Sequence, residues 1–205
     1  MQRLVHPIRI QPLLDRLDQS EIRSIRERYS GSTEHYAKYA DIRRWLKLNA
    51  KRVQDLKLHR SRPSSVLDLG CGGGFFLYIL QQFGHEGLGT DIDDFPLFRE
   101  LVDLFHIQRT IFRINPFQPL PDFGRKFDLI TAFSTSFNRK SHRVWWGPAE
   151  WRYFIDDLMG HLRPRGRIFF GLNPDDTGRY YSPELHACFR GRGAIIDREN
   201  VMFTS

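Results

Sequence analysis

The chain has very few cysteines and no long hydrophobic run. Only Cys71 and Cys188 occur among its 205 residues, which is too few for a scaffold held together by disulfides. No segment approaches the roughly 18 consecutive apolar residues that a membrane-spanning helix needs. Residues 1–7 also lack the apolar core of a signal peptide. We therefore expect reduced thiols, a cytoplasmic location and no association with a membrane.

The chain also lacks any long block of Lys and Arg residues, although it is basic overall. It has 31 Lys and Arg against 24 Asp and Glu, a net charge of +7, which favours acidic partners such as nucleic acids or phosphorylated metabolites. The basic residues are scattered, and neither a zinc-finger nor an RNA-recognition signature is present. The charge alone therefore does not separate a nucleic-acid-binding surface from a solvated, arginine-rich one.

What the chain does have is a glycine-rich turn between a strand-like and a helix-like apolar run. Residues 66–76 read VLDLGCGGGFF. Glycine lets the backbone approach a ligand closely and adopt positive φ angles, and the helix N-terminus that follows offers N–H groups to an anion. This arrangement is typical of a nucleotide-like cofactor site at the carboxyl end of a parallel strand.

The spacing of the glycines separates two classes of cofactor. The dinucleotide fingerprint G-x-G-x-x-G would need a glycine where Phe75 or Leu77 stands, so an NAD-dependent oxidoreductase is disfavoured. The pattern that fits is acid-x-Gly-x-Gly-x-Gly, formed by Asp68, Gly70, Gly72 and Gly74.

A second acidic residue, Asp91, ends the strand-like run of residues 87–91. It follows the glycine loop by about 20 residues, where doubly wound folds place a carboxylate on the ribose hydroxyls. A carboxylate suits that task because its two oxygens can accept from both hydroxyls of a diol. Asp91 is therefore the predicted ribose acceptor; the alternative is an aspartate that caps the next helix or lies in a solvated turn.

These features resemble motif I and the following acid of the class I S-adenosylmethionine-dependent methyltransferases. Three more passages occur in the family's order: a third strand over residues 110–114, a Phe-Asp pair opening a strand over residues 127–133, and Leu-x-Pro-x-Gly at residues 162–166. The resemblance covers about residues 60 to 205. It implies S-adenosylmethionine as cofactor and an α/β fold: a doubly wound, Rossmann-like, mostly parallel seven-stranded sheet with helices on both faces and an abbreviated C-terminal hairpin.

The resemblance also implies roles for individual residues. Ile92 would lie against the adenine. Many members carry an acid after the third strand, and residues 115–119 contain none, so Asn115 and the backbone near Phe117 are expected to recognise the adenine instead. The expected cofactor-binding residues are Asp68, Gly70, Cys71, Gly72, Gly74, Asp91, Ile92, Asn115, Phe117, Phe133 and Tyr39.

Two helical segments are predicted before the core. Apolar residues recur at helical spacing over residues 13–25 and again over residues 33–56. We divide the chain into an N-terminal helical lid or cap, residues 1–59, and an S-adenosylmethionine-binding core, residues 60–205. Family members often fold such a helix over the methionine end of the cofactor, which makes Tyr39 a lid residue; alternatively, its ring simply packs on the core.

The methyl acceptor is expected beside the loop of residues 134–147, because ligand sites in open α/β sheets lie beyond the carboxyl ends of the strands. Its basic residues could hold a phosphate or carboxylate, its tryptophans could stack on a flat or cationic group, and its histidine is the candidate general base. The loop contains no acid, so no metal site is expected. The candidates are His142 as catalytic base and Arg139, Lys140, Arg143, Trp145 and Trp146 as substrate-binding residues.

The sequence thus favours an S-adenosylmethionine-dependent methyltransferase that acts on a small molecule, anionic if the basic residues of the loop face it. The loop lacks the Pro-Pro-aromatic motif of enzymes that methylate adenine, cytosine or glutamine. Two alternatives stay open: RNA methylation, suggested by the charge alone, and a catalytically inactive cofactor-binding module that regulates a partner. The acceptor atom and the oligomeric state do not follow from the sequence.

Overall fold

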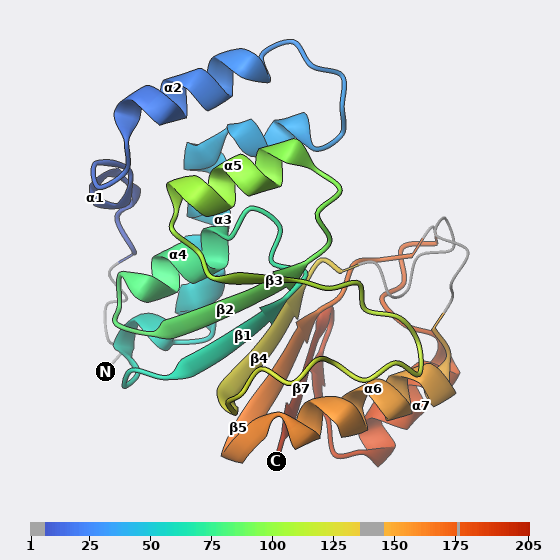
Figure 1. Cartoon of the computed structure of the whole chain (residues 1–205). Helices are drawn as coiled ribbons and strands as arrows, with labels where there is room; N and C mark the ends of the chain where they lie inside the picture. Colours follow the sequence, from blue (N-terminus) through green and yellow to red (C-terminus); the bar gives the residue numbers. More distant parts are fainter. Residues whose placement is uncertain (1–6, 136–145, 176) are drawn as a thin grey trace. The chain divides into compact units, whose positions relative to one another are not determined.

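The computed structural model describes residues 7–135, 146–175 and 177–205 (Figure 1). Its seven strands are ordered β3-β2-β1-β4-β5-β7-β6. Strand β2 pairs in parallel with β3, and β4 pairs in parallel with both β1 and β5. Strand β7 is antiparallel to β5 and β6. The predicted Rossmann-like, mostly parallel sheet with a C-terminal hairpin is therefore confirmed.

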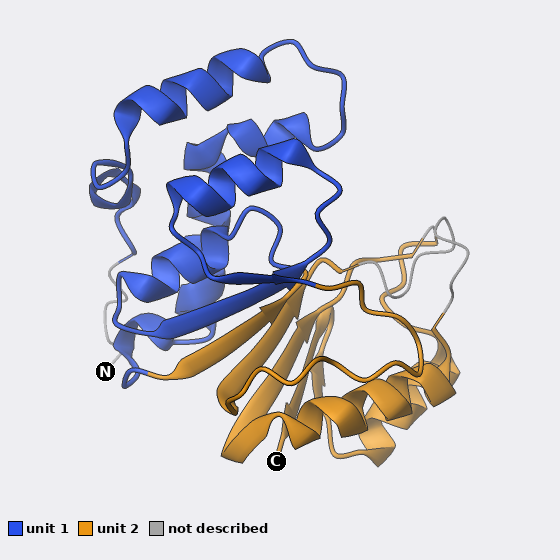
Figure 2. Ribbon diagram, in the orientation of Figure 1, with its two compact units in different colours: residues 1–63, 71–111 blue, residues 64–70, 112–205 orange. Residues whose placement is uncertain are grey.

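The chain divides into two compact units (Figure 2). Unit 1 comprises residues 1–63 and 71–111, and unit 2 comprises residues 64–70 and 112–205. Unit 1 contains α1 (Ile10–Leu14), α2 (Gln19–Arg28), the 3-10 turn η1 (Ala37–Ala40), α3 (Ile42–Asp55), the 3-10 turn η2 (Leu58–Arg60), α4 (Phe75–Gln81), β2 (Glu86–Asp91), α5 (Pro96–Leu104) and β3 (Arg109–Ile111). Unit 2 contains β1 (Ser65–Leu69), β4 (Phe127–Phe133), α6 (Pro148–Gly160), β5 (Leu162–Gly171), α7 (Pro183–Gly191), β6 (Ile195–Asp197) and β7 (Asn200–Thr204).

Unit 1 is built around α4, which directly follows the glycine loop. Every residue from Phe75 to Leu80 is buried, as expected for a short helix that is apolar on all sides. Tyr78 stacks on Phe105 with ring centroids 4.8 Å apart, and its hydroxyl donates to the Leu13 carbonyl at 2.6 Å. The N-terminal helices and the cofactor loop thus share one core.

Two boundaries in unit 1 differ from the sequence prediction. The long helix expected over residues 33–56 begins only at Ile42, because the Asp41 carboxylate caps it by accepting from the Arg44 amide at 3.1 Å. The third strand ends at Ile111 rather than at residue 114. Its partner β2 ends at Asp91, which lies opposite Ile111, so the residues beyond have no strand to pair with.

The core of unit 2 is aromatic. Trp151 is fully buried in α6, and its ring meets Phe170 of β5 and Phe189 of α7 edge-on, each at 5.2 Å between centroids. Phe189 in turn contacts Phe203 of the antiparallel strand β7 at 5.9 Å. These contacts attach α6 to β5 and α7 to β7, and they pack the two helices against each other.

Candidate functional site

The loop after β1 contains three glycines with positive φ, at alternate positions. Gly70, Gly72 and Gly74 have φ values of +68°, +56° and +79°, a region that costs L residues with a side chain roughly 1–2 kcal/mol. A Cβ on Gly74 would lie 2.7 Å from Ile107 Cγ1, and one on Gly73 would lie 2.6 Å from Leu101 Cδ1. The C-terminal part of the loop is therefore glycine-rich because it packs closely on α5 and on Ile107 just beyond that helix.

Gly72 differs from these neighbours because a Cβ at this position would not clash with the surrounding atoms. A Cβ there would reach the Phe98 ring only at an ordinary contact distance of 3.6 Å. It is glycine at a positive φ, and its amide donates to the Asp91 carboxylate at 2.5 Å. The two sequence motifs, 19 residues apart, thus meet in one hydrogen bond.

Asp91 lies at the end of β2 and accepts two backbone hydrogen bonds. One carboxylate oxygen binds the Gly72 amide, and the other binds the Ile92 amide at 2.7 Å. Burial raises the pKa of Asp91 above its usual value, while these two amides and the Arg109 guanidinium oppose the rise and Asp94 adds to it. A carboxylate has about four acceptor positions, so two remain after the amides are bound. That number fits the two hydroxyls of a ribose.

Cys71 connects the glycine loop to the same strand. Its amide donates to the Thr90 carbonyl at 3.0 Å, and a Cβ on Gly89 would lie only 2.5 Å from the Cys71 sulfur. The cysteine side chain is thus packed directly over β2, and its contact with the cofactor stays a prediction.

The N-terminal segment brings Tyr39 into this neighbourhood. Its ring stacks on Trp45 at 4.2 Å and meets Phe98 edge-on at 5.0 Å. Burial raises the pKa of the Tyr39 hydroxyl, and the negative charge of Asp91 raises it further. Tyr39 therefore belongs to an aromatic cluster with Trp45 and Phe98 near Asp91, and its role as a lid residue stays a prediction.

Unit 2 carries the other acid of motif I, Asp68, which is 4% exposed. Thr131 of β4 lies opposite it in the parallel ladder and donates its hydroxyl to the Asp68 carboxylate at 2.6 Å. The sequence pattern did not indicate Thr131. A polar residue inside the apolar run of residues 127–133 is the signal that could have found it.

Replacing Thr131 with valine should lower the free energy of unfolding by about 1.5–3 kcal/mol, because it removes a buried hydrogen bond to a charged group while keeping the side-chain shape. Urea denaturation measures the loss, and Thr131→Ser, which keeps the hydroxyl, is the matched control. A valine variant as stable as the wild-type protein would show that this hydrogen bond contributes nothing.

Three further predicted cofactor residues lie elsewhere in unit 2. The side-chain amide of Asn115 donates to Gln118 at 2.7 Å. Phe117 is 55% exposed, with φ at +57°. Phe133, the last residue of β4, packs on Phe169 at 5.6 Å. Their contact with the adenine stays a prediction.

Among the predicted acceptor residues, only Trp146 lies within the described part of the chain. It is 4% exposed and packs edge-on against Trp151 and Phe154, at 5.6 Å and 5.1 Å. Its ring therefore belongs to the core of unit 2 and packs against α6. The other candidates lie outside the described residues: Arg139, Lys140, His142, Arg143 and Trp145.

A pocket of about 270 Å³ opens in unit 2 beside Trp146. Its wall includes the first residues of α6 and α7, which follow β4 and β5 in the chain, and the Asn173 amide donates to the Ser134 carbonyl at 2.7 Å, joining the ends of those strands. The pocket therefore lies at the carboxyl edge, where open α/β sheets bind ligands. Aromatic rings and charges of both signs line it: Trp146, Asp175, Arg179, Tyr180, Tyr181 and Glu184.

The described residues contain no cluster of three or more His, Cys, Asp or Glu side chains that could hold a metal ion. None of the helices in the described ranges is both long and apolar enough to cross a membrane.

Comparison with known proteins identifies the relatives of this chain. Residues 35–172 match the family model of a methyltransferase domain, whereas comparison with curated proteins gives no match. Among solved structures, Streptomyces venezuelae DesVI is similar over 92% of this chain and 98% of its own, with 11% identity and a TM-score of 0.56.

Two other similar structures are longer proteins. CalS10, an amino pentose methyltransferase from Micromonospora echinaspora, matches 73% of this chain and 55% of its own, with 21% identity and a TM-score of 0.44. The glycopeptide N-methyltransferase MtfA matches 64% and 55%, with 15% identity and a TM-score of 0.45. The chain thus spans about half the length of these two proteins. At these identities the similarity concerns the fold.

Proposed function

Because this chain belongs to the methyltransferase-domain family and has the class I fold, with S-adenosylmethionine as the cofactor, we propose that it methylates a small-molecule acceptor. One observation carries the assignment of the site. The amide of Gly72 in the glycine loop and the carboxylate of Asp91 at the end of β2 are joined by a hydrogen bond, so the two parts of the cofactor motif form one structure.

Within this proposal, Asp91 accepts from the ribose hydroxyls through its remaining lone pairs. Ile92 lies beside the adenine, and Tyr39 contributes to an N-terminal cap. The division into a cap of residues 1–59 and a core of residues 60–205 belongs to the same proposal. When bound, S-adenosylmethionine supplies an activated methyl group, so the chief task of the protein is to align the acceptor, which can contribute about 7–11 kcal/mol in favourable cases.

The pocket in unit 2 supports an acceptor of small size. Its volume of about 270 Å³ is slightly below the range of roughly 300–1,000 Å³ typical of sites for small molecules. The pocket is lined by two carboxylates, Asp175 and Glu184, and by the guanidinium of Arg179. It therefore supports a small acceptor but does not indicate whether that acceptor is anionic, neutral or cationic. An anionic acceptor, and His142 as a general base for a hydroxyl, remain proposals that depend on the loop of residues 136–145.

The test is a methyl-transfer assay on the purified protein with labelled S-adenosylmethionine. Pools of small amines, hydroxy compounds and carboxylates are compared with pools of RNA. We expect label in a small-molecule pool. Label in RNA alone would overturn the small-molecule proposal, and cofactor binding without transfer to any pool would favour an inactive binding module.

With an acceptor from that assay, Tyr180→Ala tests whether the pocket binds it. Losing an aromatic contact worth about 0.5–1.5 kcal/mol beyond its buried area should raise the acceptor KM by roughly three- to tenfold, with little change in the Kd of the cofactor. Tyr153→Ala is the matched control, because this tyrosine of α6 contacts Phe117 and does not line the pocket. Equal KM values for the two variants would place the acceptor site elsewhere.

A further inference from the structure

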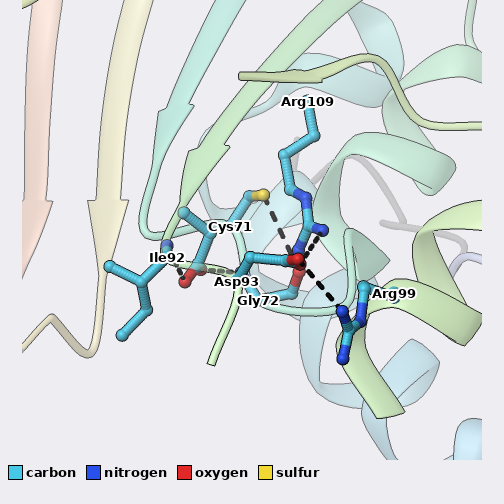
Figure 3. Close-up of polar contacts among 7 residues, drawn as sticks. Cys71, Gly72, Ile92, Asp93, Arg99 and Arg109 are labelled. Atoms are coloured by element: carbon cyan, nitrogen blue, oxygen red, sulfur yellow. Dashed lines mark hydrogen bonds and ion pairs between the residues drawn. The ribbon is translucent and has the colours of Figure 1, made fainter. Parts of the chain in front are cut away.

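Arg109, the first residue of β3, is a buried cation close to the proposed ribose acid. Its side chain is 7% exposed, and one guanidinium nitrogen donates to Asp93 at 2.8 Å (Figure 3). Arg99 of α5 binds the other oxygen of the same carboxylate at 3.2 Å, but its side chain is 51% exposed. Asp93 therefore forms ion pairs with two arginines, the buried Arg109 and the half-exposed Arg99.

The pair with Asp93 does not account fully for the buried guanidinium. The second terminal nitrogen of Arg109 is buried and has no hydrogen-bond partner among the described residues. Asp93 itself is about one-third exposed. Burying a cation is costly unless it is well paired. The half-satisfied guanidinium of Arg109 is therefore expected to interact favourably with a second group besides Asp93. Its charge also acts on Asp91, whose pKa it lowers.

The groups around Asp91 divide into those that favour its charged form and those that oppose it. The amides of Gly72 and Ile92 donate to it, and Arg109 attracts it from β3. Burial and the carboxylate of Asp94 oppose its charge, and the Tyr39 hydroxyl, from the N-terminal segment, is coupled to it electrostatically. Arg109 is thus the cation that balances a desolvated carboxylate.

We propose that Arg109 is a positioning residue of the cofactor site, which holds the turn after β2 through Asp93 and supplies the positive charge that keeps Asp91 a hydrogen-bond acceptor for the ribose. The ion pair fixes the chain two residues beyond Asp91, and the field of the buried guanidinium acts on Asp91 itself. The proposal rests on the ribose role of Asp91 given above.

The first test follows the titration of the Asp91 carboxyl by NMR in the protein without cofactor, labelled with ¹³C at aspartate. In Arg109→Gln the midpoint should move to higher pH, because a cation that favours the charged form is lost. In Asp93→Asn the Asp91 midpoint should move to lower pH, because the negative charge of Asp93 no longer offsets the attraction between Arg109 and Asp91. Arg99→Gln, the exposed partner of the same carboxylate, is the matched control and should leave the midpoint in place.

Arg109→Lys covers the case in which the glutamine variant does not fold. It keeps the charge and should keep a midpoint close to that of the wild-type protein, and Asp93→Asn alone still tests the direction of the shift. The proposal is overturned if Arg109→Gln and Arg99→Gln move the midpoint equally, or if Asp93→Asn raises it.

The second test measures the affinity for S-adenosylhomocysteine across the pH range in which the variants stay folded. Affinity should rise with pH as Asp91 ionises, and Asp91→Asn supplies the baseline for the ligand's own titration. Arg109→Gln should bind about three- to tenfold more weakly at the acid end and recover toward the alkaline end. An Asp91→Asn variant with wild-type affinity would refute the ribose role, whereas normal Asp91 dependence without a change in Arg109→Gln would refute only the role of Arg109.

Discussion

Replacing Asp91 with alanine is expected to weaken S-adenosylmethionine binding by at least about a hundredfold. A hydrogen bond to a charged group contributes about 1.5–3 kcal/mol, and a ribose offers two hydroxyls, so the loss is at least about 3 kcal/mol. The substitution also removes the acceptor that holds the Gly72 amide at 2.5 Å. Both effects lower affinity, and isothermal titration calorimetry measures their sum.

Asp94→Ala is the matched control for this experiment. Asp94 lies in the same turn, carries the same charge and is exposed. Its carboxylate repels that of Asp91, so its loss should leave cofactor affinity unchanged or slightly improved. A folded Asp91→Ala protein whose affinity falls by less than about threefold, under 1 kcal/mol, would contradict the ribose assignment.

The parts of the site that the sequence could predict depend on neighbouring strand ends. In a parallel sheet the residues that follow adjacent strands gather at one edge. A glycine loop after one strand and an acid ending the next can therefore be predicted to lie close together without knowledge of side-chain packing. The hydrogen bond from Gly72 to Asp91 is consistent with this rule.

The parts that the sequence could not predict depend on register. Thr131 reaches Asp68 because the two residues lie opposite each other in the ladder between β1 and β4. Arg109 lies opposite Gly89, which lets its long side chain extend along β2 to Asp93. A shift of the strands by one residue would turn each side chain to the other face. In β1 every residue is buried, so its apolar pattern shows no alternation from which the register could be predicted.

Trp146 illustrates a different limit. A tryptophan next to a basic loop is compatible with ligand stacking and with core packing, because both uses require the same large, mostly apolar ring. The structure buries Trp146 against Trp151 and Phe154 and also leaves it at the wall of the pocket. Sequence spacing indicates that such a ring is anchored near the site, but it does not indicate which part of the ring remains for a ligand.

Replacing Gly72 with valine is expected to abolish detectable S-adenosylmethionine binding while leaving the protein folded. At φ of +56°, a β-branched residue pays roughly 1–3 kcal/mol of strain, and its methyl groups extend beyond a Cβ that already lies 3.6 Å from Phe98. The backbone will relax away from positive φ, which turns the amide away from Asp91. Both the loop and the ribose acceptor then lose the geometry that the cofactor needs.

Gly124→Val separates this effect from a general loss of stability. Gly124 has φ of +65°, a Cβ there would meet nothing within 4 Å, and its amide also donates to an aspartate, Asp122, at 2.8 Å. The control therefore carries a similar backbone penalty in the loop between β3 and β4. Both variants should lower the free energy of unfolding by about 1–3 kcal/mol, and only Gly72→Val should lose the cofactor. Wild-type affinity in Gly72→Val would mean that the loop is a structural turn, whatever its glycine spacing.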